Sequence, residues 1–185
     1  LLAMIAGFIF LRLRGILGRR TGHEKNLDTS FTHEFPSKKT AKDSLDKINF
    51  NDQAKNDFLK GAKIAYETII TNFAIGNLKN IKSLLDKKVF DQFNEAIKDR
   101  KDKGYISNTT FIGINSASIK EHKTINNILE VTVDFVSEII SCIKDKDNNI
   151  LSGDPQKIKK VYDTWKFSKD IGSKNLNWLL IDTQT

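Results

Sequence analysis

The hydrophobic positions of the chain divide it into three unlike stretches. Residues 1–11 (LLAMIAGFIFL) are uncharged and apolar, residues 21–51 are polar with scattered phenylalanines, and residues 52–185 carry apolar side chains at regular spacings. An apolar run, a polar stretch without a period and a periodic body are typical of an anchor, a linker and a folded domain. We therefore predict a membrane-anchor helix with a basic flank in residues 1–20, a flexible linker in 21–51 and one domain in 52–185.

The first half of the predicted domain has the period of amphipathic helices. Apolar residues recur three and four positions apart over residues 58–73, Asp52 is a suitable N-cap, and Gly76 would end this helix. A short helix is predicted in 77–85, and a third begins after Asp86, which can serve as its N-cap. Short connections between these helices should bring their apolar faces together.

After residue 104 the apolar period changes from that of a helix to that of a strand. We predict four strands, in residues 109–119, 129–143, 161–168 and 178–183, with a bulge at Gly113. Residues 144–155 predict a turn-rich hairpin loop. Helices followed by hairpin-linked strands favour the α+β class, with the helices packed on one face of an antiparallel sheet.

The net charge of +7 is concentrated at the start of the chain. Residues 1–20 contain no acid, and their basic residues are Arg12, Arg14, Arg19 and Arg20. The other residues therefore hold 26 of the 30 Lys and Arg against all 23 Asp and Glu. Because the body is nearly balanced, its composition does not favour a domain that binds polyanions.

The apolar run predicts a membrane anchor formed by Leu2, Ile5, Phe8, Ile9, Phe10 and Leu11. Eleven helical residues reach about 16 Å, roughly half of a hydrocarbon core. The printed chain begins with Leu rather than Met, so we expect further apolar residues upstream. The four arginines follow the run, which predicts contacts with anionic lipid and a body on the cytoplasmic side of a bacterial inner membrane, or the matrix side in a mitochondrion. The alternative is a short core helix with a solvated basic end.

Few residues of this chain could carry chemistry. One cysteine and three histidines exclude a disulfide framework and a Cys-rich zinc site, and no nucleotide-binding, zinc-protease or nucleophile-elbow motif is present. We therefore expect no enzyme activity, no catalytic residue, no cofactor and no metal. Asp134, Glu138 and Asp163 could do acid–base work, but a solvated sheet face is the favoured interpretation. Cys142 is expected in the core and His122 in an exposed turn.

The aromatic residues suggest a core and a candidate binding pocket. Their periodic positions predict mainly core, and a pocket for an apolar ligand could be lined by Tyr66, Phe73, Phe93, Phe135, Trp165 and Trp178. In the linker, Phe31, Phe35 and Phe50 are candidate interaction motifs. Basic residues interleave with aromatics at Lys159, Lys160, Lys166 and Lys169, which indicates either a strand that faces RNA or lipid headgroups or a solvated edge strand.

Three segments of the chain resemble one known family. They are AGFIFLRLRGILGRRTGHE at the front, FLKGAKIAYETIITNFAIGNLKNIKSLLDKKVFDQFNEAIKDRKDKG in the helical half, and KVYDTWKFSKDIGSKNLNWLLIDTQ near the end. The most specific positions are Gly61-Ala62, residues 65–67 (AYE), the turn 73–77, and Phe90 with Phe93. On these residues the chain resembles the bacterial relatives of Tim44, the import-motor scaffold of the mitochondrial inner-membrane translocase.

The resemblance implies a fold and a function class. The fold would be of the nuclear-transport-factor-two-like (cystatin-like) type, with helices on a curved antiparallel sheet and an apolar pocket. The function would be that of a non-enzymatic adaptor at the inner membrane, in contact with anionic lipid and protein partners and linked to protein translocation. Mitochondrial members recruit an Hsp70-type chaperone through a long N-terminal region without counterpart in these 185 residues, so the resemblance does not extend chaperone recruitment to this chain.

A sister branch of the same domain belongs to the large subunit of the mitochondrial ribosome. The alternative function is therefore a membrane-associated module that binds ribosomes or RNA, and we expect contact with nucleic acid only through a ribosome. The two functions differ in how binding responds to salt. Association with RNA should weaken steeply as the salt concentration rises, because lysines that neutralise phosphates release counterions.

Overall fold

The computed structural model describes residues 50–173 and 177–184. The predicted anchor in residues 1–20 and nearly all of the predicted linker lie outside this part of the chain. Three helical elements come first and four strands follow, which confirms the α+β prediction. The elements are α2 (Asp52–Ile75), the 3₁₀ helix η1 (Leu78–Leu84), α3 (Lys87–Asp102), β1 (Ile106–Ile125), β2 (Ile128–Lys144), β3 (Ile150–Asp170) and β4 (Leu179–Gln184). None of the described helices has the length and apolar character needed to cross a bilayer.

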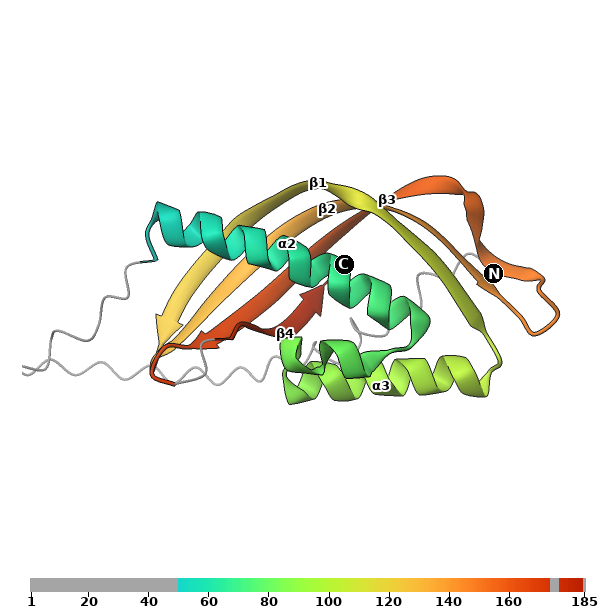
Figure 1. The fold of residues 1–185 in the computed structure, drawn as a ribbon, viewed down its shortest axis with the longest axis horizontal. Helices are drawn as coiled ribbons and strands as arrows, with labels where there is room; N and C mark the ends of the chain where they lie inside the picture. Colours follow the sequence, from blue (N-terminus) through green and yellow to red (C-terminus); the bar gives the residue numbers. More distant parts are fainter. Residues whose placement is uncertain (1–49, 174–176, 185) are drawn as a thin grey trace, which may run out of the picture.

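The strands form one antiparallel sheet in the order β1-β2-β3-β4. Figure 1 shows them arching over the helices, with α2 lying along the curve. Strand β1 contains three register shifts, which follow Phe111, Ile114 and Ile119. Each shift inserts an extra residue and bends the strand, so these bulges account for part of the curvature and confirm the one predicted at Gly113.

The ends of the helices follow the predicted capping with one correction. Gly76 ends α2 in the left-handed conformation (φ 76°), and the Oδ1 atom of Asp86 accepts the backbone N–H of Val89 at 2.7 Å. The prediction of Asp52 as the N-cap of α2 was wrong. Asn51 is the cap, because its extended backbone lets Oδ1 accept the N–H of Ala54 at 2.9 Å. Asp52 is the first helical residue, where its charge still favours the helix dipole.

Strands β1 and β3 are much longer than predicted, and the predicted loop 144–155 was wrong in its second half. The hairpin turn covers residues 145–149, and β3 begins at Ile150. The four residues 155–158 form a large irregular bulge opposite the single β2 residue Ile140. Gly153 permits the approach to β2, since its φ is 80° and a Cβ there would lie 2.2 Å from the carbonyl oxygen of Ser141. Gly153 and Pro155 thus lie within an irregular part of β3 rather than in a loop.

The core lies between the helices and the concave face of the sheet. Its centre is aromatic: the ring of Tyr66 stacks on Phe135 at 4.4 Å between centroids and lies 4.5 Å from Trp165. Phe93 and Phe167 are also buried, whereas Phe73, Phe90 and Trp178 are partly buried against the same cluster. A fully buried side chain of this size contributes about 1.5–3 kcal/mol of transfer free energy. The aromatic residues therefore belong mainly to the core, as predicted.

Candidate functional site

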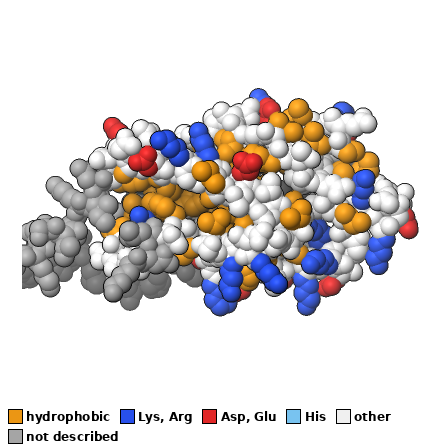
Figure 2. Space-filling model, in the orientation of Figure 1, with side chains coloured by type: hydrophobic (Ala, Val, Ile, Leu, Met, Phe, Trp, Pro, Cys, Tyr) orange, Lys and Arg blue, Asp and Glu red, His pale blue; other side chains and the backbone are white. Residues whose placement is uncertain are grey.

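A pocket of about 730 Å³ opens at one end of the domain, between the first half of α2, η1 and the ends of β2, β3 and β4. Figure 2 shows apolar side chains in this hollow, toward the left of the view. A volume in this range is typical of sites for small organic ligands. The lining residues are Phe50, Ala54, Asp57, Phe58, Gly61, Ala62, Ala65, Ser83, Leu84, Leu129, Phe167, Lys169, Ile171, Asn177 and Trp178.

Small side chains on α2 create this space. Ala54, Gly61, Ala62 and Ala65 face the pocket, and a Cβ placed on Gly61 would meet no atom within 4 Å. A glycine inside a helix costs about 1 kcal/mol relative to alanine. That cost is not explained here by close packing, since the space beside Gly61 is open.

Aromatic rings from α2 and from the sheet side form much of the remaining pocket lining. The ring of Phe58 lies 4.5 Å from Trp178 and 5.8 Å from Phe167, measured between centroids. Phe50 closes one end, with its ring 5.9 Å from Phe58 and 6.4 Å from Trp178. Rings in tilted and edge-to-face contact can accept a further apolar or aromatic group without losing their own packing.

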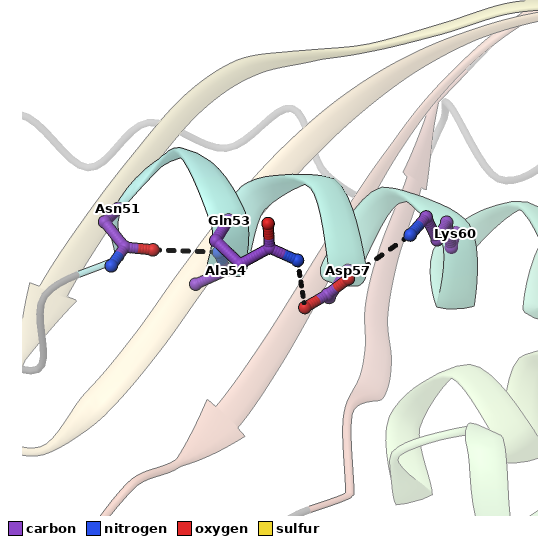
Figure 3. A network of polar contacts seen from close by, with 5 residues as sticks. All are labelled: Asn51, Gln53, Ala54, Asp57 and Lys60. Atoms are coloured by element: carbon purple, nitrogen blue, oxygen red, sulfur yellow. Dashed lines mark hydrogen bonds and ion pairs between the residues drawn. The ribbon is translucent and has the colours of Figure 1, made fainter.

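Two charged residues, Asp57 and Lys169, line the pocket, and they differ in their polar partners. Asp57 accepts hydrogen bonds from Gln53 Nε2 at 3.0 Å and Lys60 Nζ at 3.4 Å (Figure 3). The bond from Gln53 is the main reason that the pKa of Asp57 lies below its ordinary value. Lys169 Nζ lies 5.8 Å from the ring centroid of Trp178, and no ion pair within the described residues involves it.

The residues predicted to line a pocket fall in three places. Trp178 lines the pocket just described, whereas Tyr66 and Phe73 line a second cavity of about 70 Å³ nearer the end of α2. Phe93, Phe135 and Trp165 belong to the core cluster and line neither cavity. Sequence reasoning missed Gly61 and the alanines of α2. A run of small residues along the apolar face of a predicted helix is the signal that could have found them.

A buried polar cluster joins α2 to the sheet. Tyr66 Oη donates to Asp163 Oδ2 at 2.5 Å and lies 2.9 Å from Ser137 Oγ. A phenol has one proton, so Ser137 is the donor in the second bond. The remaining oxygen of the carboxyl, Asp163 Oδ1, is buried without a hydrogen-bond partner. Burial raises the pKa of Asp163 to about 6 and is also the main reason that the pKa of Tyr66 lies above its ordinary value.

The prediction that Asp163 lies on a solvated face was wrong, since only 3% of the residue is exposed. The reason is the period of two along β3: Asp163 shares a face with Trp165 and Phe167, both of which point into the core. The hydroxyl of Tyr66 makes burial tolerable by donating to the carboxylate. Asp163 lies two and four residues before Trp165 and Phe167, so the alternation along the strand could have indicated from the sequence that its side chain is buried.

Asp134 and Glu138 lie on the opposite, convex face of the sheet from Asp163. Asp134 accepts a hydrogen bond from Thr164, and Glu138 accepts one from Asn115 at 3.0 Å. The three carboxylates therefore do not converge on one site. The described part of the chain contains no group of three or more His, Cys, Asp or Glu residues that could hold a metal ion. Cys142 is buried as expected; His122 is exposed, but on β1 rather than in a turn.

The four lysines considered for RNA binding are divided between the two faces of the sheet. Across the regular register of β3 with β2, Lys160 and Lys166 pair with Glu138 and Thr132 on the convex face. Lys159 and Lys169 lie on the face that carries the helices, ten residues apart along the strand. They do not form one continuous basic patch.

Arg100 is a buried charge that sequence reasoning did not single out. Its Nη2 donates to the carbonyl oxygen of Phe73 at 3.2 Å, at the end of α2, and its guanidinium lies 5.8 Å from the Phe73 ring centroid. Burial lowers its pKa. The side chain thus places a positive charge at the negative end of the helix dipole, a stabilising arrangement.

The described domain is thus a helical layer on a curved antiparallel sheet, with an apolar pocket at one end. The family model of the Tim44-like domain matches residues 46–185. The chain therefore belongs to the Tim44-like family, as its resemblance in sequence indicated. Members of this family are associated with scaffold and adaptor roles in membrane-associated complexes. No curated protein matches the chain.

Solved structures are similar to this chain only in outline. The intermembrane space region of the chloroplast protein ARC6 is 10% identical, with a TM-score of 0.48, and the match covers 68% of this chain and 94% of that one. A periplasmic fragment of TraM is 7% identical, with a TM-score of 0.41 and coverage of 70% and 94%. A putative NTF2-like transpeptidase from Campylobacter jejuni is 15% identical, with a TM-score of 0.26 and coverage of 66% and 94%.

Proposed function

We propose that this protein is a non-enzymatic adaptor attached to an inner membrane by residues 1–20, which presents its Tim44-like domain to protein partners on the cytoplasmic or matrix side. The family match over residues 46–185 supports the adaptor role, and the apolar run followed by four arginines in residues 1–20 supports the membrane anchor. Protein translocation is the membrane process in which we place it. The polar stretch 21–51 would separate the anchor from the domain, since thirty extended residues reach about 100 Å.

The chemistry of the large pocket supports binding rather than catalysis. Its titratable lining residues are Asp57 and Lys169. A general acid or base works best with a pKa near the operating pH, yet the pKa of Asp57 is lowered and its carboxylate is engaged by Gln53 and Lys60. An apolar segment of a partner or a lipid chain is the type of ligand that suits such a lining.

Membrane attachment is tested by extraction with alkaline carbonate. We expect the full chain to stay with the membrane pellet and a version comprising residues 21–185 to be released. A variant in which Arg12, Arg14, Arg19 and Arg20 are all replaced by Gln keeps the apolar run and serves as the matched control; it should stay in the pellet but lose preference for anionic lipid, since each Arg contributes about 1 kcal/mol. Equal release of the full and shortened chains would contradict the anchor.

The ribosome-binding alternative makes a different prediction. Association through lysines and phosphates should weaken steeply with salt. The division of Lys159, Lys160, Lys166 and Lys169 between two faces gives this alternative less support. Sedimentation with ribosomes at 50 and 200 mM salt, roughly the range over which such contacts are lost, distinguishes the two functions.

A further inference from the structure

We propose that the large apolar pocket is occupied by the chain's own linker, through residues 31–36 (FTHEFP), when no partner is bound. The inference rests on the proposed function, in which this pocket is the binding surface of the adaptor. Phe31 and Phe35 are the apolar groups that would enter the pocket. The linker would then act as an internal competitor for the site.

The position of Phe50 leads to this assignment. Phe50 is the first described residue, and it lines the pocket, with its ring 5.9 Å from Phe58, 5.2 Å from His122 and 6.4 Å from Trp178. The described part of the chain therefore begins at the pocket. Phe50, which belongs to the predicted linker, already lines the pocket, and Phe31 and Phe35 precede it in the sequence.

The length of the linker permits the contact. Residue 36 is fourteen residues before Phe50, so the intervening chain can extend to roughly 45–50 Å. The far end of the pocket wall on α2 is at Ala65, fifteen residues beyond Phe50, which corresponds to about 22 Å of helix. A segment joined by such a short chain reaches an effective concentration in the millimolar range, so even weak affinity would fill the pocket.

Space and charge both fit this segment. The pocket offers about 730 Å³ beside Gly61, where no side chain intrudes, and aromatic rings can pack there against Phe58 and Trp178. Residues 28–37 contain Asp28 and Glu34 and no Lys or Arg. Of the two charged residues at the pocket, Asp57 is already hydrogen-bonded to Gln53 and Lys60, whereas Lys169 has no ion-pair partner within the described residues. The carboxylate of Glu34 would therefore complement Lys169.

Disulfide cross-linking in the full chain, reconstituted in lipid nanodiscs, tests the proposal. One variant combines Ser30→Cys with Gly61→Cys, which places a thiol inside the pocket. The matched control combines Ser30→Cys with Ile64→Cys, three residues along the same helix but 69% exposed. The native Cys142 is buried and is present in both. A disulfide forms only when the two Cα atoms approach within about 4.4–6.8 Å, so the rate reports the position of the linker.

We expect the intramolecular disulfide to form roughly tenfold faster at residue 61 than at residue 64, because docking concentrates the linker at the pocket. Replacing Phe31 and Phe35 by Ala should reduce the rate at residue 61 to that of the control. Equal rates at the two positions, or a rate that does not respond to loss of the phenylalanines, would overturn the proposal. Disulfides between two chains at residue 61 would assign the pocket to a second copy and would also overturn it.

The cross-linking experiment and the carbonate extraction test different claims, so a negative result in one does not decide the other. A chain released by carbonate could still show the fast cross-link at residue 61, which would remove the anchor and leave the docking intact. A chain retained in the membrane without the fast cross-link would remove the docking and leave the proposed function intact.

Discussion

The hydroxyl oxygen of Tyr66 on α2 lies 2.5 Å from Oδ2 of Asp163 on β3, so a carboxyl group anchors the long helix to the centre of the sheet. The other carboxyl oxygen is buried without a partner. A buried carboxylate with one unsatisfied oxygen favours its protonated form. The stability of the domain should therefore respond to pH through this residue.

We predict that the contribution of Asp163 to stability declines as the pH rises. Burial raises its pKa to about 6 in the folded protein from 3.8, so the folded state binds the proton more tightly. The contribution is fully present below pH 3.8 and is lost as the pH rises through about 6. The difference between these two pKa values corresponds to a change of at most about 3 kcal/mol in the free energy of unfolding.

Urea unfolding of the wild type and of Asp163→Asn between pH 4 and pH 8 measures this effect. Subtracting the two free energies of unfolding at each pH cancels the contribution of the other carboxylates, which both proteins share. The difference should shift by up to about 3 kcal/mol in favour of the Asn variant at high pH. A difference that does not change with pH would show that Asp163 titrates normally.

Removing only the hydroxyl of Tyr66 should destabilise the domain. Tyr66→Phe keeps the ring against Phe135 but leaves both oxygens of Asp163 without a donor, at a cost of about 1–3 kcal/mol. Because the bond from Tyr66 lowers the pKa of Asp163, its loss should raise that pKa further. Carbon-detected NMR titration of the Asp163 carboxyl measures the shift; an unchanged pKa would place the hydroxyl elsewhere.

Gly61 allows the pocket and the helix to be tested separately. Gly61→Ala should stabilise α2 by about 0.5–1 kcal/mol while leaving most of the pocket open. Gly61→Leu has a similar helix propensity but fills the space, so it should weaken binding of an apolar fluorescent dye several-fold relative to Gly61→Ala. Thermal unfolding and dye titration give the two readouts. Equal dye binding by both variants would mean that the dye, and by extension a ligand, binds elsewhere.

The N-cap of α2 gives a test of the described helix start. Asn51→Ala removes the acceptor of the Ala54 N–H and should cost about 1 kcal/mol. Asp52→Ala, one residue on, should cost only about 0.3 kcal/mol, through the helix dipole. Chemical unfolding of the pair measures this contrast. The opposite ranking would restore Asp52 as the cap.

The sequence predicted the class of the fold because its periods are long and uninterrupted. Helix α2 follows from apolar residues three and four apart and from Gly76, and β2 follows from strict alternation. Strand β3 was largely missed, because Gly153 and Pro155 are typical of turns. Gly153 instead pairs with Cys142 of β2, and Pro155 begins a bulge of four residues, an arrangement that only the partner strand β2 reveals.

The candidate site was harder to predict than the fold. Large aromatic residues suggested the pocket lining, but Phe135 and Trp165 fill the core. The pocket is formed by what α2 lacks, at Gly61 and the neighbouring alanines. Whether a small residue borders a space or a tight contact depends on side chains far away in sequence, here Phe167 and Trp178. Periodicity within one helix cannot supply that information.

The measurement that tests the central claim most directly is affinity isolation of the full chain from detergent-solubilised native membranes, with and without nuclease. We predict that the same set of membrane proteins is recovered in both samples, and that the chain shortened to residues 21–185 recovers less of it. Recovery of ribosomal proteins that disappear after nuclease treatment, with no membrane protein retained, would contradict the account of this chain as an adaptor of a membrane complex.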